Sequence, residues 1–349
     1  KLDAENSDYS EFQGGLAPED YFDRFDEDGE PEETEEKTWE GYDKANEEYN
    51  GAIYTYIPVI PESEEIPEDT ALPEIHVQVG DAGIALYSGR IEGQGTEEDP
   101  WQIKNEEDWK TITTSRRYCN SGNLQGCIRL EGNIDFSQIK EESRKIPLKL
   151  NGKTFDGNGY PIENLTKPLF SVANGTVKNL ILPDVEIEGN GNQGAIAEAV
   201  VNKATIEKCY ISGSITATGS NNSGVGGLIG AAQNAQGAPL TIENCVVNAD
   251  ITGKGSSLAG GLIGSVSNSD VVTIKKCIAM GTVSTVEDKG SGGLVGGPGR
   301  SVTIKNSAAL QEEVSTKSSK YFVDRIFGYD GDYKVHVVGE QNFAYQGMK

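Results

Sequence analysis

The two histidines of the chain are the first place to look for metal chemistry. A zinc peptidase holds its metal through His-Glu-x-x-His, in which two imidazoles lie on one face of a helix. His76 and His336 are far apart in the chain, in His-Val-Gln-Val and His-Val-Val-Gly, and both stretches alternate like strands. The sequence therefore predicts no zinc hydrolysis by this chain.

An acidic stretch near the start offers carboxylates for calcium. Asp23, Asp26, Asp28 and Glu30 lie within a few residues of one another, and a calcium loop binds its ion through carboxylates at fixed positions. The spacing matches no complete EF-hand loop, and the terminal glutamate of such a loop is missing. An acidic linker is the favoured interpretation and calcium the weaker alternative. No other cofactor is predicted.

Carbohydrate cleavage would need paired carboxylates, or a basic residue with bound calcium, on one outer face. Corresponding positions of successive repeats carry Glu207, Glu243, Lys275 and Lys305. Opposite charges on neighbouring strands stabilise a stack, and no aspartate pair recurs at the repeat spacing. We therefore predict no catalytic residues.

Sugar binding without catalysis would use exposed aromatic rings. Tyr118, Tyr160 and Tyr210 are the candidates for such a ligand face. For Trp101 and Trp109 the favoured interpretation is that both rings close one end of the folded body.

The five cysteines fall into two groups. Cys119 and Cys127 flank the turn-rich stretch Asn-Ser-Gly-Asn-Leu-Gln-Gly, so we predict a disulfide between them in an oxidising compartment, with two unrelated thiols as the alternative. Cys209, Cys245 and Cys277 recur at one position of the repeats. Three thiols in a row cannot all pair, and we expect buried free thiols rather than a bridge or a metal site.

These residues sit in an internal repeat. Gly-Gly-Leu-Ile-Gly at 226–230 returns at 260–264 and, with Val for Ile, at 292–296, and each copy is followed by Thr-Ile-x-x-Cys or Thr-Ile-x-x-Ser. The period of 32 to 34 residues indicates stacked units. Each unit has three short runs of strand period, so the sequence predicts an all-β, parallel β-helix with three strands per coil and about six coils.

The alternation within Thr-Ile-x-x-Cys says which side chains face inward. Ile206, Ile242, Ile274 and Ile304 share one aliphatic position, and the two residues after each are charged or amide residues. We interpret those two residues as an outward bend, after which the cysteine position points inward again.

Charge and composition divide the chain. Residues 1–75 hold 25 Asp and Glu against 4 Lys and Arg, a net of −21 out of −25 for the chain. We predict an acidic, proline-spaced leader at 1–75, strands, a short helix and a cap at 76–147, and the β-helix with a C-terminal cap at 148–349. The helix begins at about Glu106, with Asn105 as its N-cap. The nearly neutral body has no excess of basic residues that would bind nucleic acid. No apolar run is long enough to span a membrane.

Several motifs together resemble the GLUG-motif right-handed β-helix proteins. They are Gly-Thr-Glu-Glu-Asp-Pro-Trp-x-Ile at 95–103, Thr-Phe-Asp-Gly-Asn-Gly-Tyr at 154–160 and the Gly-Gly-Leu-Ile-Gly units, within a match from about residue 93 to 348. The resemblance implies an exported scaffold of the bacterial surface, often a lipoprotein in Gram-negative gut anaerobes, and supplies no catalytic residues. Metallopeptidases that cleave immunoglobulin A can carry the same motif, but this chain lacks their zinc motif.

The function predicted from the sequence is a non-catalytic binding or adhesion protein of the bacterial outer membrane, lipid-anchored at the cell surface. Its expected partner is a surface glycan, a host matrix protein, or another envelope protein bound through residues 1–90. One alternative is a glycan-active enzyme or carbohydrate-binding accessory protein. Another is a structural subunit of an outer-membrane complex that docks through its acidic leader.

Overall fold

The structure, a computed structural model, describes residues 75–79, 82–86, 91–219, 223–233, 238–255, 257–267, 271–286, 289–297, 299, 301–317, 323–328 and 336–348. The chain divides into two units, Lys1–Arg90 and Ile91–Lys349. In the first unit, β1 (Ile75–Val79) and β2 (Ala82–Leu86) pair as an antiparallel hairpin. The calcium candidates Asp23, Asp26, Asp28 and Glu30 lie outside the described residues.

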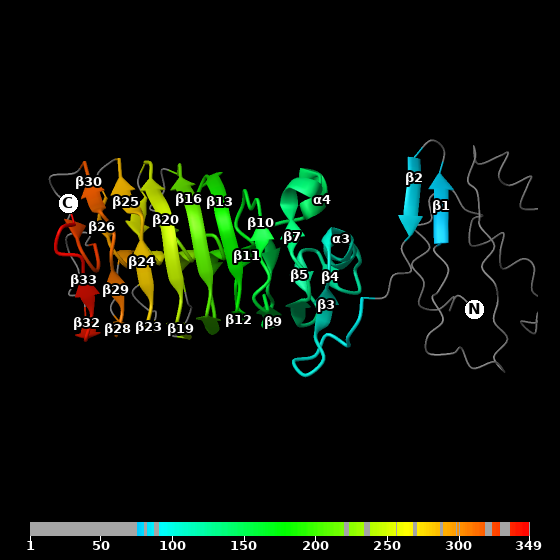
Figure 1. Ribbon diagram of the computed structural model, residues 1–349, viewed down its shortest axis with the longest axis horizontal. Coiled ribbons are helices and arrows are strands. Elements are labelled where there is room, and N and C mark those ends of the chain that lie inside the picture. The colour runs from blue at the N-terminus through cyan, green and yellow to red at the C-terminus, as the bar shows by residue number, and fades with distance from the viewer. Residues whose placement is uncertain are drawn as a thin grey trace, which may run out of the picture. The chain divides into compact units, whose positions relative to one another are not determined.

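The second unit is a parallel β-solenoid of about six turns, as predicted (Figure 1). Its longest sheet, called sheet 1 here, has nine parallel strands: β3 (Trp101–Ile103), β6 (Ile128–Leu130), β9 (Thr154–Asp156), β12 (Gly175–Lys178), β15 (Ala204–Glu207), β19 (Pro239–Glu243), β23 (Val271–Lys275), β28 (Ser301–Lys305) and β32 (His336–Glu340). Because β3 and β6 belong to this sheet, the ladder begins before residue 148, within the stretch predicted as a cap.

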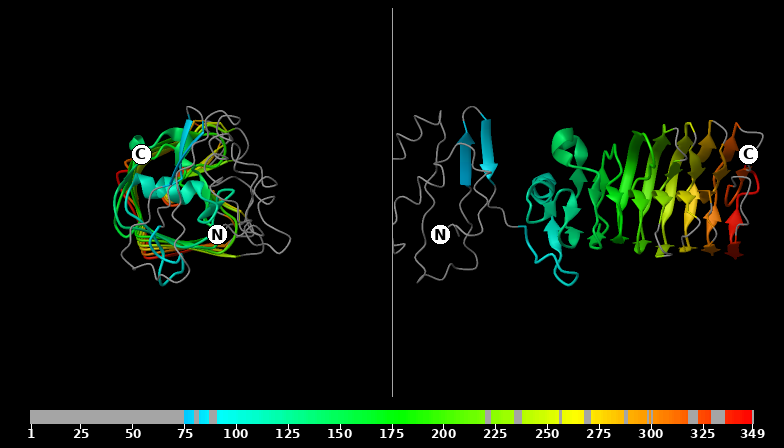
Figure 2. Two further views of the ribbon diagram at one scale, coloured as in Figure 1. Left: turned by 90° about the vertical axis from the view of Figure 1, so that its right-hand side faces the viewer. Right: turned by 180° about the vertical axis from the view of Figure 1, so that it is seen from behind.

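Two further long sheets complete the coils, which Figure 2 shows end-on. Sheet 2 consists of β4 (Cys119–Asn120), β5 (Asn123–Leu124), β8 (Leu148–Lys149), β11 (Phe170–Val172), β14 (Ala197–Val200), β18 (Ile229–Ala232), β22 (Ile263–Val266) and β27 (Val295–Gly297). Sheet 3 consists of β13 (Ile181–Gly189), β16 (Tyr210–Ala217), β20 (Val246–Gly253), β24 (Ile278–Met280), β25 (Thr282–Thr285), β29 (Ala308–Ala309), β30 (Glu313–Thr316) and β33 (Phe343–Ala344). A separate pair joins β7 (Ile134–Asp135) to β10 (Ile162–Glu163).

The later coils contain a fourth strand that the sequence did not predict. Sheet 4 consists of β17 (Gly224–Gly226), β21 (Leu258–Gly260), β26 (Ser291–Gly292) and β31 (Val323–Asp324). The Gly-Gly-Leu-Ile-Gly motif is therefore an arch between two strands and not one strand.

Glycine is required in this arch because two backbones touch there. A Cβ on Gly260 would lie 2.1 Å from the carbonyl oxygen of Ile263 and 2.4 Å from the amide nitrogen of Gly296 in the next coil. All residues of β17 and β18 are buried, so the strands of the arch are covered on both faces. The repeated glycines thus mark backbone contact between sheets 2 and 4.

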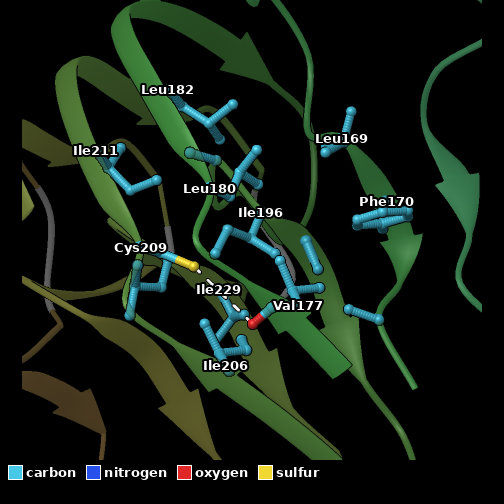
Figure 3. Packing of buried hydrophobic residues seen from close by; sticks show 14 of the residues in the cluster. Leu169, Phe170, Val177, Leu180, Leu182, Ile196, Ile206, Cys209, Ile211 and Ile229 are labelled. Atoms are coloured by element: carbon cyan, nitrogen blue, oxygen red, sulfur yellow. Dashed lines mark hydrogen bonds between the residues drawn. The ribbon is translucent and has the colours of Figure 1, made fainter. Parts of the chain in front are cut away.

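The predicted aliphatic column is confirmed. Phe155, Val177 and the four isoleucines of the repeat, Ile206, Ile242, Ile274 and Ile304, are paired in register through sheet 1. Each is at most 1% exposed, and Figure 3 shows Val177 and Ile206 within the same packed interior. Each such side chain contributes about 1.5–3 kcal/mol of transfer free energy, so this column is a main stabilising feature of the solenoid.

The predicted outward bend is also confirmed. Asn179, Lys208, Asn244, Lys276 and Asn306 have φ between 51° and 56°, the left-handed conformation that asparagine tolerates better than most residues. This single residue turns the chain from sheet 1 into sheet 3. The residue after it is buried in every coil.

Aromatic side chains fill the N-terminal end of the solenoid. Helix α3 (Glu106–Thr114) is capped by the side chain of Asn105, as predicted, and carries the buried Trp109. The Trp109 ring centroid lies 5.1 Å from that of Phe136, and those of Phe155 and Phe170 are 5.6 Å apart. Two short helices follow, η2 (Phe136–Gln138) and α4 (Glu141–Arg144).

None of the helices that the structure describes is both long and apolar enough to cross a membrane.

Candidate functional site

A hollow of about 510 Å³ lies where sheet 2 turns into sheet 1 in three successive coils. We call it the corner hollow. Each coil contributes an asparagine followed by glycine or lysine, and two of the coils add a threonine of sheet 1. The lining residues are Asn151, Gly152, Asn174, Gly175, Thr176, Asn202, Lys203 and Thr205.

Backbone hydrogen bonds between coils fix the shape of the corner hollow. The amide of Gly152 donates to the carbonyl of Asn174 at 2.7 Å, and that of Gly175 to the carbonyl of Lys203 at 3.1 Å. Gly175 has φ 124°, and a Cβ there would lie 2.3 Å from the carbonyl oxygen of Lys153. Glycine is therefore the residue that lets the second coil approach the first.

Two asparagine side chains hold the corner together. Asn174 Oδ1 accepts from the amides of Val201 and Asn202 at 3.1 and 3.0 Å. Asn151 Nδ2 donates to the carbonyl of Leu124 at 3.1 Å. These amides are occupied by the fold and are positioning groups.

The remaining lining groups are available to a ligand. Asn202 and Lys203 are exposed, and Thr176 and Thr205 are half-buried. They offer hydroxyl, amide and ammonium groups, and the lining includes no carboxylate. The corner hollow can therefore hydrogen-bond a polar ligand, but it has no pair of groups for general acid and base catalysis.

A ladder of threonines continues from the hollow along the outer face of sheet 1. Its six members are paired in register: Thr154, Thr176, Thr205, Thr241, Thr273 and Thr303. The neighbouring outward row carries charges, with Lys178 Nζ 3.5 Å from Asp156 and Lys305 Nζ 2.7 Å from Glu340. Such exposed pairs contribute little individually, but they match the prediction that charges in successive coils neutralise one another.

The aromatic ligand candidates do not form a binding face. Tyr118 is buried, with its ring 4.7 Å from that of Trp101, and its hydroxyl accepts from the amide of Ile91 at 3.1 Å. It is a core residue because its hydroxyl has a backbone partner. Tyr160 is half-buried against the core, and Tyr210 is 37% exposed on β16. Trp101 and Trp109 are buried, as predicted.

The structure does not contain the predicted bridge between Cys119 and Cys127, and both are free thiols. Cys119 lies on the β4–β5 hairpin, where its cross-strand partner is Leu124. Cys127 Sγ instead faces the next coil and accepts from the amide of Thr154 at 3.4 Å. Burial raises the pKa of the Cys119 thiol, which keeps it protonated and unreactive.

The three repeat cysteines form a buried column of free thiols, as expected. Cys245 Sγ lies 3.4 Å from the carbonyl of Glu243, and Cys277 Sγ lies 3.1 Å from that of Lys275. Hydrogen bonding with Cys209, together with burial, raises the pKa of Cys245, and hydrogen bonding with Cys245 does the same for Cys277. Protonated thiols of this kind are fillers of the core rather than nucleophiles or metal ligands.

Two further observations concern titratable groups. Burial raises the pKa of Glu198 on β14, a carboxyl that sequence reasoning did not single out. The histidines lie on strands of different units, His76 on β1 and His336 on β32. Within the described parts of the chain, no group of three or more His, Cys, Asp and Glu is placed to hold a metal ion.

Sequence reasoning missed the corner hollow itself. Its signal is the recurrence of asparagine two or three residues before a threonine, in Asn-Gly-Lys-Thr at 151–154, Asn-Gly-Thr at 174–176 and Asn-Lys-Ala-Thr at 202–205. The asparagines read as ordinary corner residues, and nothing in the sequence alone says that three corners together leave a hollow.

Comparison with known proteins gives a family match over part of the chain. Residues 121–213 match the family described as M26 IgA1-specific metallo-endopeptidase, N-terminal region. The chain is 31% identical over 199 residues to an immunoglobulin A1 protease of Streptococcus sanguinis, covering 54% of this chain and 10% of that protein. It is 24% identical over 290 residues to one of Streptococcus pneumoniae serotype 4, covering 79% of this chain and 14% of that protein.

Two solved structures share the fold. One, assigned provisionally as an immunoglobulin A1 protease from Bacteroides ovatus, has a TM-score of 0.58 at 24% identity, over 74% of this chain and 79% of that chain. The other, an IgA1 protease, has a TM-score of 0.54 at 20% identity, over 79% of this chain and 23% of that one. At this identity the likeness shows the β-solenoid alone.

These matches correct the function predicted from the sequence. The prediction of a non-catalytic surface adhesion protein is wrong, because the matched relatives are named proteases and the matched family is one of metallo-endopeptidases. The same matches contradict the prediction that the chain is not an enzyme. They support the β-helix but neither the GLUG family name, nor glycan or matrix partners, nor an outer-membrane lipoprotein.

Proposed function

We propose that this chain takes part in the proteolysis of immunoglobulin A1, as the β-solenoid region that contacts the immunoglobulin. One observation carries the proposal: all the residues that line the corner hollow, from Asn151 to Thr205, lie within the stretch 121–213 that matches the metallo-endopeptidase family.

The chemistry of the hollow suits a polypeptide ligand. Peptide N–H and C=O groups need hydrogen-bond partners when they leave water, and the hollow offers threonine hydroxyls, the amide of Asn202 and the ammonium of Lys203. The proposal assigns substrate contact to this chain and no zinc site to its two histidines.

The chain spans about a tenth of the length of the curated relatives it matches. Cleavage of the immunoglobulin is a property named for those longer relatives, and for this chain we only propose a part in it. Because immunoglobulins are extracellular proteins, the proposal requires export. Lipid anchoring and outer-membrane localisation stay predictions, which fractionation of the producing cells tests.

Binding of the full chain to purified immunoglobulin A1, measured by calorimetry, tests the proposal directly. The double variant Asn202→Ala with Lys203→Ala removes exposed side chains of the hollow, and we expect it to weaken binding at least about tenfold. The double variant Asn120→Ala with Lys140→Ala removes the same kinds of exposed groups elsewhere and should bind like the parent chain. No complex at about 100 μM, or equal binding by all three proteins, would refute the proposal.

A competition assay extends the test to proteolysis. The chain, added in excess, should slow the cleavage of immunoglobulin A1 by the Streptococcus sanguinis enzyme, because both would occupy the same region of the substrate. The hollow variant should compete less well than the parent chain. If the chain binds immunoglobulin A1 but leaves its cleavage unchanged, the proposed role in proteolysis is wrong although the binding is real.

A further inference from the structure

An unbroken row of apolar residues follows the outer face of sheet 3. Its members are paired in register from coil to coil: Pro161, Ile181, Tyr210, Val246, Ile278, Ala308 and Phe343. We call this row the apolar ladder. Each member is half-buried or exposed, and Phe343 is 67% exposed. Figure 1 shows the long strands that carry much of it, β13, β16 and β20, side by side.

The apolar surface widens toward the C-terminal coils. The next outward row begins with Ser212 and Asn248 and continues with Met280, Leu310 and Tyr345. Leu310 is 41% exposed and Tyr345 is 49% exposed. From Met280 onward two adjacent apolar rows form a contiguous patch, and soluble proteins expose such patches mainly where they meet a partner.

The outer face of sheet 1 shows that this pattern is not a general property of the solenoid. There the corresponding rows are threonines and charged residues, and the charges pair within the chain, as in Lys178 with Asp156. Val271 is 42% exposed at the first position of β23 on that face, where its register partners are Pro239 and Ser301. The apolar ladder is thus a feature of sheet 3 that sheet 1 lacks.

The two edges of the sheet 3 face carry opposite charges. At the bend into the sheet, Lys208 and Lys276 are exposed, and Lys276 Nζ also lies 3.4 Å from Glu243 Oε1 of the preceding coil. On the other side of the apolar rows, the exposed Glu186, Asp250 and Glu313 lie at alternate levels of one outward row, with Ser214 and Thr282 at the levels between them. A partner for this face needs an apolar centre with acidic groups opposite the lysine edge and basic groups opposite the acidic edge.

A second copy of the same face meets these requirements in one orientation. We propose that the outer face of sheet 3 is the surface through which two copies of this chain associate, with a two-fold axis parallel to the solenoid axis. Rotation about that axis exchanges the edges, so each lysine edge meets the acidic edge of the other copy. A two-fold axis along the strands would instead place lysine against lysine.

In the C-terminal coils this arrangement also matches the apolar rows to each other. With the axis between the two rows, Phe343 faces Tyr345 of the second copy and Ala308 faces its Leu310, each contact occurring twice as in an isologous interface. The small Ala308 leaves room for the larger Leu310.

The size of the face suits a weak to moderate dimer. Seven rungs about 4.8 Å apart span roughly 29 Å, and four outward rows about 7 Å apart add a width of roughly 20 Å. The resulting footprint, on the order of 600 Å² per copy, approaches the roughly 800 Å² of a standard interface.

Analytical ultracentrifugation of the full chain over a range of concentrations tests the proposal. We expect a monomer–dimer equilibrium that Leu310→Glu and Phe343→Glu each weaken at least about tenfold. Val271→Glu makes the same change at an equally exposed site on sheet 1 and should leave the equilibrium unchanged. A monomer at every concentration, or equal weakening by Val271→Glu, would overturn the proposal.

Charge exchange tests the orientation. Lys276→Glu and Glu313→Lys should each weaken the dimer, and the double variant should restore it, because each lysine edge then again meets an acidic edge. Circular dichroism checks that all variants are folded. No restoration in the folded double variant, or a loss of immunoglobulin A1 binding in Leu310→Glu while the chain stays monomeric, would show that the face serves another partner.

Discussion

The first coils of the solenoid and the last coils fill their interior in opposite ways. One column of sheet 1 begins with Trp101 and reaches Phe155, and the same column continues as isoleucine in the later coils. At the N-terminal end the rings of Trp109, Phe136 and Phe155 pack together. From residue 224 onward the interior is narrowed by the glycine arch, where sheets 2 and 4 meet backbone to backbone.

The two regions show that the register between coils and the interior volume of a coil are determined by different features of this fold. Hydrogen bonding between coils fixes where each side chain lies, and the residue at that place decides how much space the coil encloses. The aromatic coils depend on buried area, whereas the arch coils depend on the absence of side chains. Substitutions in the two regions should therefore destabilise the chain for different physical reasons.

The largest effect is expected in the arch. Gly260→Ala places a methyl group 2.1 Å from the carbonyl oxygen of Ile263, and backbone on both sides cannot move away without breaking the coil. We expect a loss of more than about 4 kcal/mol, measured as the shift of the denaturation midpoint or as failure to fold. Gly339→Ala is the matched control, because the nearest atom to its new Cβ is Asn342 Nδ2 at 3.4 Å. If Gly260→Ala folds with the stability of the parent chain, the backbones of sheets 2 and 4 are not in contact at the arch.

A cavity at the aromatic end should cost somewhat less. Trp109 is fully buried and its indole N–H donates to the carbonyl of Arg144 at 3.0 Å. Trp109→Ala removes both the ring and that hydrogen bond, and we expect a destabilisation of about 3–5 kcal/mol in urea unfolding. Trp109→Phe keeps most of the volume and should cost about 1–2 kcal/mol. Equal losses for the two variants would mean that the hydrogen bond, not the ring, closes this end.

Most of the fold was predictable from local patterns. The period-two alternation around Ile206, Ile242, Ile274 and Ile304 gave the inward column, and Asn105 with three following acids gave the N-cap of α3. The fourth strand was not predictable, because Gly-Gly-Leu-Ile-Gly has the length and alternation of one strand. That the chain folds back within the motif depends on backbone contact with the next coil.

The candidate site and the function were less accessible from the sequence. The corner hollow depends on three corners coming together, and Asn174 has no different local sequence signal from any turn asparagine. The lack of a His-Glu-x-x-His motif in these residues was taken as evidence against an enzyme. That conclusion was wrong, because the comparisons point to the N-terminal region of a peptidase family. Tyr118 was misjudged because its partner, the amide of Ile91, is distant in the chain.

A smaller effect is expected in the thiol column, which runs through the later coils. Cys245→Ser replaces the thiol by a hydroxyl that can donate to the carbonyl of Glu243, as Ser307 donates to that of Lys305 at 2.9 Å in the same column. We expect a destabilisation of about 1 kcal/mol in urea unfolding. Cys245→Leu should cost about 1–3 kcal/mol by overpacking. If leucine is tolerated better than serine, the arch coils contain unfilled space.

The smallest effect concerns the place where the two regions meet. Glu198 lies on β14 in the last coil before the arch, and the same outward position is glycine in the three coils that follow, at Gly230, Gly264 and Gly296. Burial raises the pKa of its carboxyl. The folded chain therefore binds this proton more tightly than the unfolded chain, so the stability that the proton confers is complete below the unfolded pKa and is lost as the pH rises through the folded pKa.

Replacement of this carboxyl by a neutral amide separates desolvation from any structural role. At pH 7 Glu198→Gln removes a partly desolvated charge, so its denaturation midpoint should lie above that of the parent chain, and the advantage should vanish at about pH 3.5, where both side chains are neutral. Glu312→Gln makes the same change at an exposed carboxylate on the sheet 3 side and serves as the control for the substitution itself. If Glu198→Gln is instead less stable at pH 7, the carboxylate has a favourable partner in the folded chain.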